Sequence, residues 1–236
     1  MEAWIDQLFS KELLEEAASV FGARIEEAKK LGDFENYVYE VHKEGVPYIL
    51  RLTHESHRKK QEVEAEVRWI NYLHSKGVNV SLVHTSINGE IVEEIRVSDS
   101  SFYVCLFDKA PGAIVRGNDD AFGPALFKEW GRVTGKMHRV TKMYDEGERV
   151  RPRWDEDDLL QFHHYLKEED TDIITGGNEI VKELSKLPET EDVFGLIHSD
   201  IHPGNFFYHE EKIHVFDFDD SMYFHYVSDV AIPLYY

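Results

Sequence analysis

The stretch HSDIHPGN, residues 198–205, places His198, Asp200, His202 and Asn205 around a Pro-Gly bend. Apolar runs flank it, with VFGLI before the motif and FFY after it. Short apolar runs next to turn residues are typical of buried strands. We therefore predict a loop held between two short strands, and loops supported in this way often contain binding or catalytic residues.

A second polar stretch, VFDFDDS, occupies residues 215–221 at the end of another short apolar run. If the chain on either side of the turn at 206–212 pairs antiparallel, Asn205 and Asp217 come close together. A carboxylate and an amide oxygen are hard ligands that suit Mg²⁺. Asp200, at the bend of the first motif, would remain free to accept a proton.

Composition limits the class of protein. The chain has 236 residues, 42% of them hydrophobic, which is enough for one large domain or two small ones. A net charge of −20 argues against a nucleic-acid partner and would attract a cationic small molecule. The sequence shows no signal peptide and no run of about 18 apolar residues that could span a membrane. Cys105 is the single cysteine, so no disulfide can form within the chain, and a reducing compartment is expected. We therefore expect a cytoplasmic protein with no membrane partner.

The first half of the chain is rich in strand patterns. Apolar spacing predicts a helix at 4–18 and a longer one at 61–75 that stops at Gly77. Turn residues predict hairpins at 44–47 and at Asn88-Gly89. Strands are predicted at 24–31, 37–43, 48–53, 83–86, 91–97 and 102–107.

The pattern changes at DKAPG, residues 108–112, where Gly112 is expected to permit movement between two lobes. Helices are predicted beyond this point at 122–140, 155–166 and 178–187, and short strands at 195–197 and 213–216. The chain is thus predicted to be an α+β protein of two lobes, a strand-rich lobe at 1–107 and a mainly helical lobe at 108–236.

His198-x-Asp200, with Asn205 five residues further on and Asp217 in the later FDFDD, resembles the catalytic and metal-binding motifs of the aminoglycoside phosphotransferase and choline kinase family. Homoserine-kinase-like enzymes belong to the same group. The resemblance implies a protein-kinase-like fold, with an N-terminal antiparallel sheet and one long helix in the nucleotide-binding lobe. It also implies that the catalytic lobe lacks the family's last helices, because the chain stops in the apolar run 231–236.

The resemblance also implies roles for single residues. Asp200 would be the catalytic base, and Asn205 and Asp217 would hold Mg²⁺ against the phosphates of ATP. His198 would support the loop. His202 would either touch substrate or phosphate, or be structural.

Further positions have two interpretations each. Asp229 resembles a buried acid that hydrogen-bonds the catalytic loop, or it is an acid at a helix N-terminus. Gly32 and Asn36, in GDFEN, resemble the loop that covers the nucleotide, or they form an ordinary tight turn. Arg51 stands where kinases have a phosphate-binding lysine. Its expected partner is Glu66, with Glu62 as the alternative, or both glutamates lie on a solvated helix face.

The implied activity is ATP-dependent phosphoryl transfer to a hydroxyl of a small molecule, such as an aminoglycoside, choline, ethanolamine or a homoserine-like amino alcohol. Asp219, Asp220 and the acids at 155–158 could meet an ammonium group of the acceptor, although solvated loop charge also explains the acids at 155–158. Three alternatives stay open: a protein serine/threonine kinase, an ATP-binding pseudokinase, and a transition-metal enzyme with His198, Asp200 and His202 as ligands.

Overall fold

The N-terminal lobe is an antiparallel sheet, described in a computed structural model that covers residues 2–235. The strand order is β1-β2-β3-β6-β4, and β5 also pairs with β6. The strands are β1 (Arg24–Gly32), β2 (Asn36–Lys43), β3 (Val46–His54), β4 (Val83–His84), β5 (Glu93–Val97) and β6 (Ser100–Asp108). This is the sheet expected for the first lobe.

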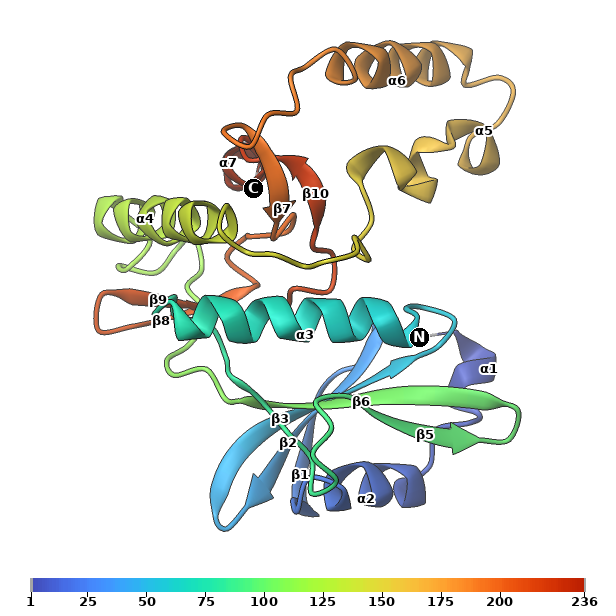
Figure 1. The fold of residues 1–236 in the computed structure, drawn as a ribbon, viewed down its shortest axis with the longest axis vertical. Helices are drawn as coiled ribbons and strands as arrows, with labels where there is room; N and C mark the ends of the chain where they lie inside the picture. Colours follow the sequence, from blue (N-terminus) through green and yellow to red (C-terminus); the bar gives the residue numbers. More distant parts are fainter. Residues whose placement is uncertain (1, 236) are drawn as a thin grey trace.

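Helices lie on both faces of this sheet (Figure 1). The short helices α1 (Ala3–Asp6) and α2 (Lys11–Ser19) occupy the positions predicted at 4–18, and the Ser10 side chain caps α2 by accepting from the Leu13 N–H. The long helix α3 (Lys60–Ser75) runs along the other face and is followed by Gly77 with φ of +72°. Figure 1 shows α3 between the sheet and the C-terminal lobe.

One predicted hairpin is wrong. Asn88-Gly89 does form a tight turn, but β4 and β5 each pair with β6 and not with each other. The hairpin is instead β5–β6, closed by a two-residue turn in which Ser98 has φ of +57°. Residues 101–106 of β6 are all buried, so this central strand pairs with a neighbour on each side.

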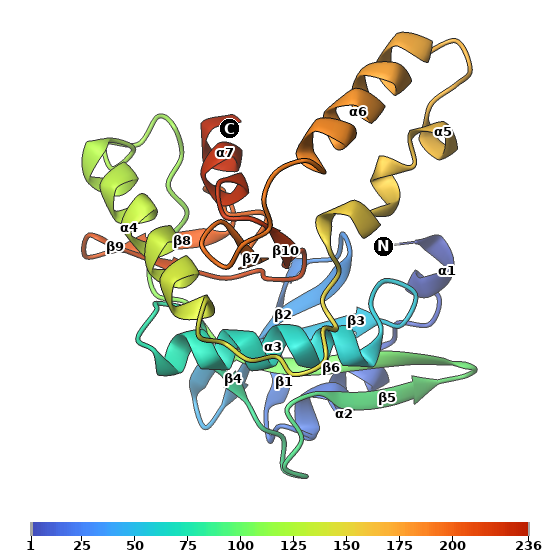
Figure 2. The ribbon, with the colours of Figure 1, turned by 45° about the horizontal axis from the view of Figure 1, so that its top comes forward.

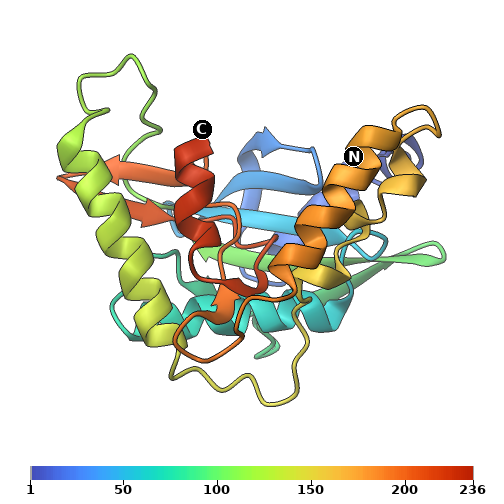
Figure 3. The ribbon, with the colours of Figure 1, turned by 90° about the horizontal axis from the view of Figure 1, so that it is seen from above.

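The C-terminal lobe contains two small antiparallel sheets, β7 with β10 and β8 with β9. Both sheets contact α4, through β7 and β9; seen from above, β7 lies between α4 and α6, whereas the β8–β9 hairpin passes across α4 (Figure 3). The elements are α4 (Pro124–Thr141), α5 (Phe162–Tyr165), α6 (Thr171–Leu184), β7 (Phe194–Ile197), β8 (Phe206–His209), β9 (Lys212–Val215), β10 (Met222–His225) and α7 (Ser228–Tyr235).

Two helix predictions in this lobe need correction. Residues 155–166 form no single helix, because the Asp157 side chain accepts from the Leu159 N–H and so competes with the hydrogen bonds of a continuous helix. The segment is divided into η1 (Trp154–Glu156), η2 (Asp158–Leu160) and α5. The helix predicted at 178–187 begins earlier and passes through Gly177, where a Cβ would lie 2.6 Å from the Phe162 ring. Close packing of α5 on α6 therefore explains this glycine, and Figure 2 shows the pair projecting from the lobe.

The α3 helix joins the two lobes. Its buried side chains belong to the same apolar cluster as α4, β8 and β9, whereas α2 and the outer face of the sheet form a separate cluster. Trp69 of α3 stacks edge-on against Phe218 and donates to the Thr141 hydroxyl at 3.1 Å. Within residues 2–235, no helix is long and apolar enough to cross a membrane.

Gly112 follows β6 at the connection between the lobes. Its φ is +96°, and a Cβ at this position would collide with the Tyr208 carbonyl of β8. The glycine is therefore required for close approach of two backbones as well as for its conformation.

Candidate active site

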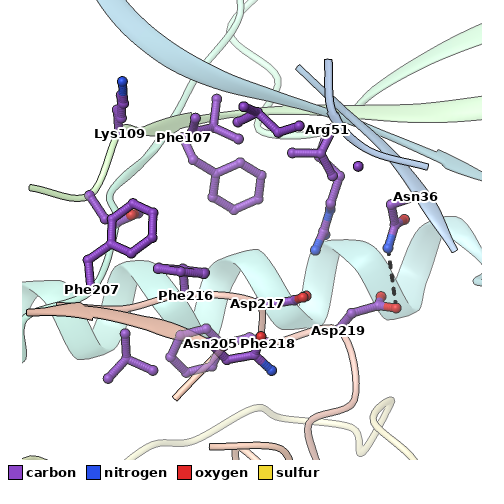
Figure 4. Close-up of a pocket in the computed structure, with 18 of the residues that line it drawn as sticks. Asn36, Arg51, Phe107, Lys109, Asn205, Phe207, Phe216, Asp217, Phe218 and Asp219 are labelled. Carbon is purple, nitrogen blue, oxygen red and sulfur yellow. Dashed lines mark hydrogen bonds between the residues drawn. The ribbon is translucent and has the colours of Figure 1, made fainter. Parts of the chain in front are cut away.

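A cleft of about 1030 Å³ lies between the sheet, α3 and the β8–β9 hairpin (Figure 4). Most of the residues singled out in the sequence line it: Gly32, Asn36, Arg51, Glu66, Asp200, His202, Asn205, Asp217, Asp219 and Asp220. The acids at 155–158 are not among the lining residues. Small-molecule ligands often bind in clefts of this size at the junction between two lobes.

The β8–β9 hairpin brings Asn205 and Asp217 together, as the antiparallel pairing predicts. Phe206 pairs with Val215, and the Phe216 N–H donates to the Asn205 carbonyl at 3.0 Å. The Asn205 amide nitrogen donates to the Asp200 carboxylate at 2.8 Å and to the Asp200 carbonyl at 2.9 Å. This leaves the amide oxygen as the available ligand atom of Asn205.

Asp217 follows β9 in the left-handed region, with φ of +64°. This conformation is uncommon for an aspartate, and residues held in it are frequent at functional sites. The Asp217 side chain is open to the cleft, but the protein of both lobes surrounds the cleft at this depth. This desolvation raises the pKa of Asp217 to about 6, although the nearby Arg51 charge acts in the opposite direction. A cation bound beside Asp217 would favour its ionised form.

Asp200 has two neighbours that restrain its carboxylate. One oxygen accepts from Asn205 and lies 3.5 Å from Nε2 of His202. Nδ1 of His202 accepts from the Gly204 N–H at 3.0 Å, so the proton of the neutral ring is on Nε2 and faces Asp200. The arrangement orients Asp200 toward the cleft.

His198 and Asp229 lie behind the loop. Asp229, in the first turn of α7, is buried and accepts from the backbone N–H groups of His198 at 3.3 Å and Ser199 at 2.8 Å. His138 of α4 lies 2.8 Å from the same carboxylate. Asp229 is therefore both an acid in a first helical turn and a buried partner of the loop.

The transition-metal alternative is wrong. Nδ1 of His198 accepts from the Asp200 N–H at 3.2 Å, and Nε2 lies 3.1 Å from the Phe216 carbonyl. Both nitrogens are occupied, and burial lowers the pKa of His198, which keeps the ring neutral. His202 also uses one ring nitrogen for Gly204, so these histidines support the loop and are not arranged as metal ligands.

Arg51 of β3 and Glu66 of α3 form a buried bidentate ion pair, with N–O distances of 2.7 and 2.6 Å. Burial disfavours the charged guanidinium, but Glu66 outweighs that effect and the pKa of Arg51 lies above its usual value. Two of the five N–H groups of Arg51 face Glu66, and Nε has no partner among the described residues. Nε is buried, so the donors left for an anionic group in the cleft are the second N–H groups of Nη1 and Nη2.

Asp219 is surrounded by donors from the N-terminal lobe. His57 lies 2.5 Å from its carboxylate, Arg58 donates at 3.4 Å, and Asn36 donates at 3.4 Å (Figure 4). Burial alone would raise the pKa of Asp219, but the His57 hydrogen bond and the neighbouring guanidinium groups hold it well below the usual range. Asp219 therefore links the segment after β9 to residues of the N-terminal lobe by hydrogen bonds.

The GDFEN loop does not use Asn36 as a free ligand. The Asn36 side chain is buried, and it also accepts from the Thr53 hydroxyl at 2.6 Å. Gly32 ends β1 at the edge of the cleft, and a Cβ there would meet no atom within 4 Å. The loop is therefore held over the cleft by Asn36, and its surroundings do not demand a glycine at position 32.

Sequence reasoning missed His57, Arg58 and His138. The run HRKK at 57–60 was the available signal, because four basic residues in succession are unusual in so acidic a chain. Among residues 2–235, one group of potential metal ligands has its atoms within 4.8 Å of one another, namely Glu35, His57 and Asp219. In this group the Asp219 carboxylate is already taken up by hydrogen bonds.

A family model described as the phosphotransferase enzyme family (APH) matches residues 27–236. Amicoumacin kinase of Bacillus subtilis (strain 168) is 37% identical over 235 residues, a match that covers 98% of this chain and 69% of the relative. Both matches include the two motifs that form the cleft.

Solved structures give the same picture. The amicoumacin kinase hAmiN, in complex with AMP-PNP, Ca²⁺ and Ami, superposes with a TM-score of 0.94 at 34% identity, covering 100% of this chain and 71% of that one. A microcompartment-associated aminopropanol kinase superposes with a TM-score of 0.76 at 20% identity over 95% of this chain and 74% of that one, a likeness of fold. The protein-kinase-like two-lobed fold expected from the sequence is confirmed.

Proposed function

Because the chain belongs to the phosphotransferase enzyme family, we propose that Asp200, Asn205 and Asp217 form its active site. The protein is an ATP-dependent enzyme that phosphorylates a hydroxyl group of a small molecule. The observation that supports this site is the meeting of the three side chains in one cleft, opposite the Arg51 guanidinium. Residues 1–107 are the proposed nucleotide-binding lobe and residues 108–236 the proposed catalytic lobe.

The phosphoryl donor is ATP with a divalent cation. We assign Mg²⁺ to the amide oxygen of Asn205 and the carboxylate of Asp217, which are hard oxygen ligands. When bound, Mg²⁺ offsets the negative charge of the phosphate oxygens. The remaining N–H groups of Arg51 donate to the same oxygens, while Glu66 holds the guanidinium in place.

Asp200 is the proposed base. Its carboxylate is oriented by the Asn205 amide at 2.8 Å. It accepts the proton of the acceptor hydroxyl as that oxygen bonds to the γ-phosphorus of ATP, while the bond to the bridging oxygen breaks and ADP leaves. His202 orients the same carboxylate from the other side. His198 and Asp229 fix the backbone of the loop, so that Asp200 keeps its position relative to the donor.

We further propose that the acceptor resembles amicoumacin, because the relative that shares 37% identity across nearly the whole chain is an amicoumacin kinase. Asp220 lines the cleft and accepts from Arg58 at 2.8 Å, so a cationic group of the acceptor would share the Asp220 carboxylate with that arginine. A cytoplasmic location remains our proposal.

The test is acceptor-dependent ADP release with Mg-ATP. The panel should contain amicoumacin, an aminoglycoside, spectinomycin, aminopropanol, choline, ethanolamine and homoserine, and we expect amicoumacin to give the highest kcat/KM. Asp200→Asn should lower kcat by roughly 10²–10⁴-fold, since it removes the base. Asp192→Asn, at a carboxylate that is 93% exposed and outside the cleft, is the matched control and should leave kcat unchanged.

Equal rates for the native enzyme and Asp200→Asn would exclude the assigned role. Turnover with a protein hydroxyl but with no member of the panel would favour a protein kinase. Binding of Mg-ATP without turnover on either kind of acceptor would favour a pseudokinase.

A further inference from the structure

Arg151 lies in the connection between α4 and η1 and has an exposed fraction of 0%. Its guanidinium donates to three backbone carbonyls: Nε to Ser221 at 2.9 Å, Nη1 to Glu62 at 3.2 Å and Nη2 to Asp219. Carbonyls, and not a carboxylate, therefore receive its N–H groups.

The two other arginines of the same stretch, RVRPR at 149–153, behave differently. Arg149 is exposed and forms a bidentate pair with Glu156 at 2.8 and 2.7 Å. Arg153 forms a bidentate pair with Glu189 at 2.9 and 2.8 Å. Such ion pairs near the surface contribute little to stability and are ordinary features of a charged protein. Arg151 is the member of the stretch that needs a different explanation.

A buried guanidinium is costly. Burial lowers the pKa of Arg151, and the nearby negative charge of Glu66 counters that effect. Loss of the guanidinium would leave three backbone carbonyls without this donor, so Arg151 contributes to stability. Stability does not explain, however, why the three carbonyls come from two separate segments beside the proposed site.

The three carbonyls belong to parts of the molecule that the proposed chemistry must hold together. Asp219 and Ser221 lie two and four residues after the proposed metal ligand Asp217. Glu62 lies in the first turn of α3, one turn before the Glu66 that orients Arg51. A single guanidinium thus connects the metal-binding segment to the helix that holds the phosphate-binding arginine.

We propose that Arg151 is a positioning residue that fixes segment 217–221 relative to α3, and so sets the place of the Asp217 carboxylate opposite Arg51. The inference rests on the proposed function of Asp217. Arginine is required because its planar fork presents donors in several directions at once, whereas a lysine has one nitrogen and cannot span three carbonyls. Loss of a group that orients a metal ligand commonly lowers metal affinity or activity by roughly 10–100-fold.

The test compares Arg151→Lys and Arg151→Met with the native chain. For each protein, ATP affinity is measured in EDTA and across a Mg²⁺ titration, and the Mg²⁺ concentration for half-maximal ADP release is determined with saturating acceptor. We expect both variants to need at least roughly tenfold more Mg²⁺, with ATP affinity in EDTA unchanged. Arg151→Lys keeps a cation and a donor nitrogen, so it remains informative if Arg151→Met, which leaves all three carbonyls without their donor, does not fold.

Arg153→Lys is the matched control, because the Arg153 side chain pairs with Asp155 and Glu189, which lie outside the cleft, and its replacement should not change the Mg²⁺ requirement. An unchanged requirement in both Arg151 variants would overturn the inference, and so would an equal loss of ATP affinity with and without Mg²⁺, which indicates a purely structural role. A native protein that binds ATP equally well with and without Mg²⁺ would instead contradict the proposed function of Asp217.

Discussion

Arg51 and Glu66 form a buried pair in which each charge depends on the other. Both side chains are nearly inaccessible to solvent, so removal of one leaves the other as an uncompensated buried charge. The Glu66 carboxylate also determines the direction in which the Arg51 guanidinium faces the cleft. The same two residues therefore contribute to stability and to the proposed phosphate binding.

We predict that Glu66→Ala lowers the free energy of unfolding by about 3–5 kcal/mol, measured by urea denaturation. The matched control is Glu64→Ala on the same helix, where the exposed pair with Arg68 should contribute only about 0.5 kcal/mol. Similar losses in the two variants would contradict the assignment of a buried pair at Glu66.

Ser199 lies between His198 and Asp200 with φ of +71°, in the left-handed region that favours glycine. Its N–H donates to Asp229 at 2.8 Å, a contact that glycine would retain. We predict that Ser199→Gly raises the free energy of unfolding by roughly 0.5–1 kcal/mol, because relief of strain exceeds the added flexibility of the unfolded chain. Thermal and urea unfolding would show the gain, and a loss of stability would mean that the serine hydroxyl has an interaction of its own.

At the scale of elements, the connection after β6 is closely packed. Gly112→Ala would place a Cβ against the Tyr208 carbonyl and would also strain the backbone at φ of +96°. We predict a loss of about 2 kcal/mol in the free energy of unfolding, or more. Gly117→Ala in the same connection is the control, since a Cβ there meets no atom within 4 Å. Equal stability of the two variants would show that β8 can move away from Gly112.

The β8–β9 hairpin explains how two short strands position a site. Four residue pairs fix its register, and this register places Asn205 beside the chain that leads to Asp217. Antiparallel neighbours in a short hairpin are determined by local pairing. The prediction of a hairpin from the local turn residues was wrong at Asn88-Gly89. There β5 pairs with β6 through the two-residue turn at Ser98, and β4 pairs with β6 as well.

At the scale of the whole molecule, the cleft is formed by both lobes, so a ligand that occupies it should stabilise them together. We predict that Mg-ATP at about 100 times its dissociation constant adds roughly 2.7 kcal/mol. For a protein of this size the shift in Tm should be roughly 5–10 °C. EDTA and Asp217→Asn should each remove most of the shift, and an undiminished shift in either case would argue against a metal site at Asp217.

The sequence by itself predicted the loop at 198–205, the approach of Asn205 to Asp217, and a helix carboxylate as partner of Arg51, with Glu66 expected and Glu62 left open. These depend on short-range spacing, on strand pairing and on helical periodicity, all of which operate over few residues. Only the tertiary structure revealed the donors around Asp219, which are 161–183 residues away in the chain, and the carbonyls held by Arg151, which are 68–89 residues away. Such contacts arise from the way two lobes pack on α3, and no local pattern specifies which distant backbone a buried side chain will meet.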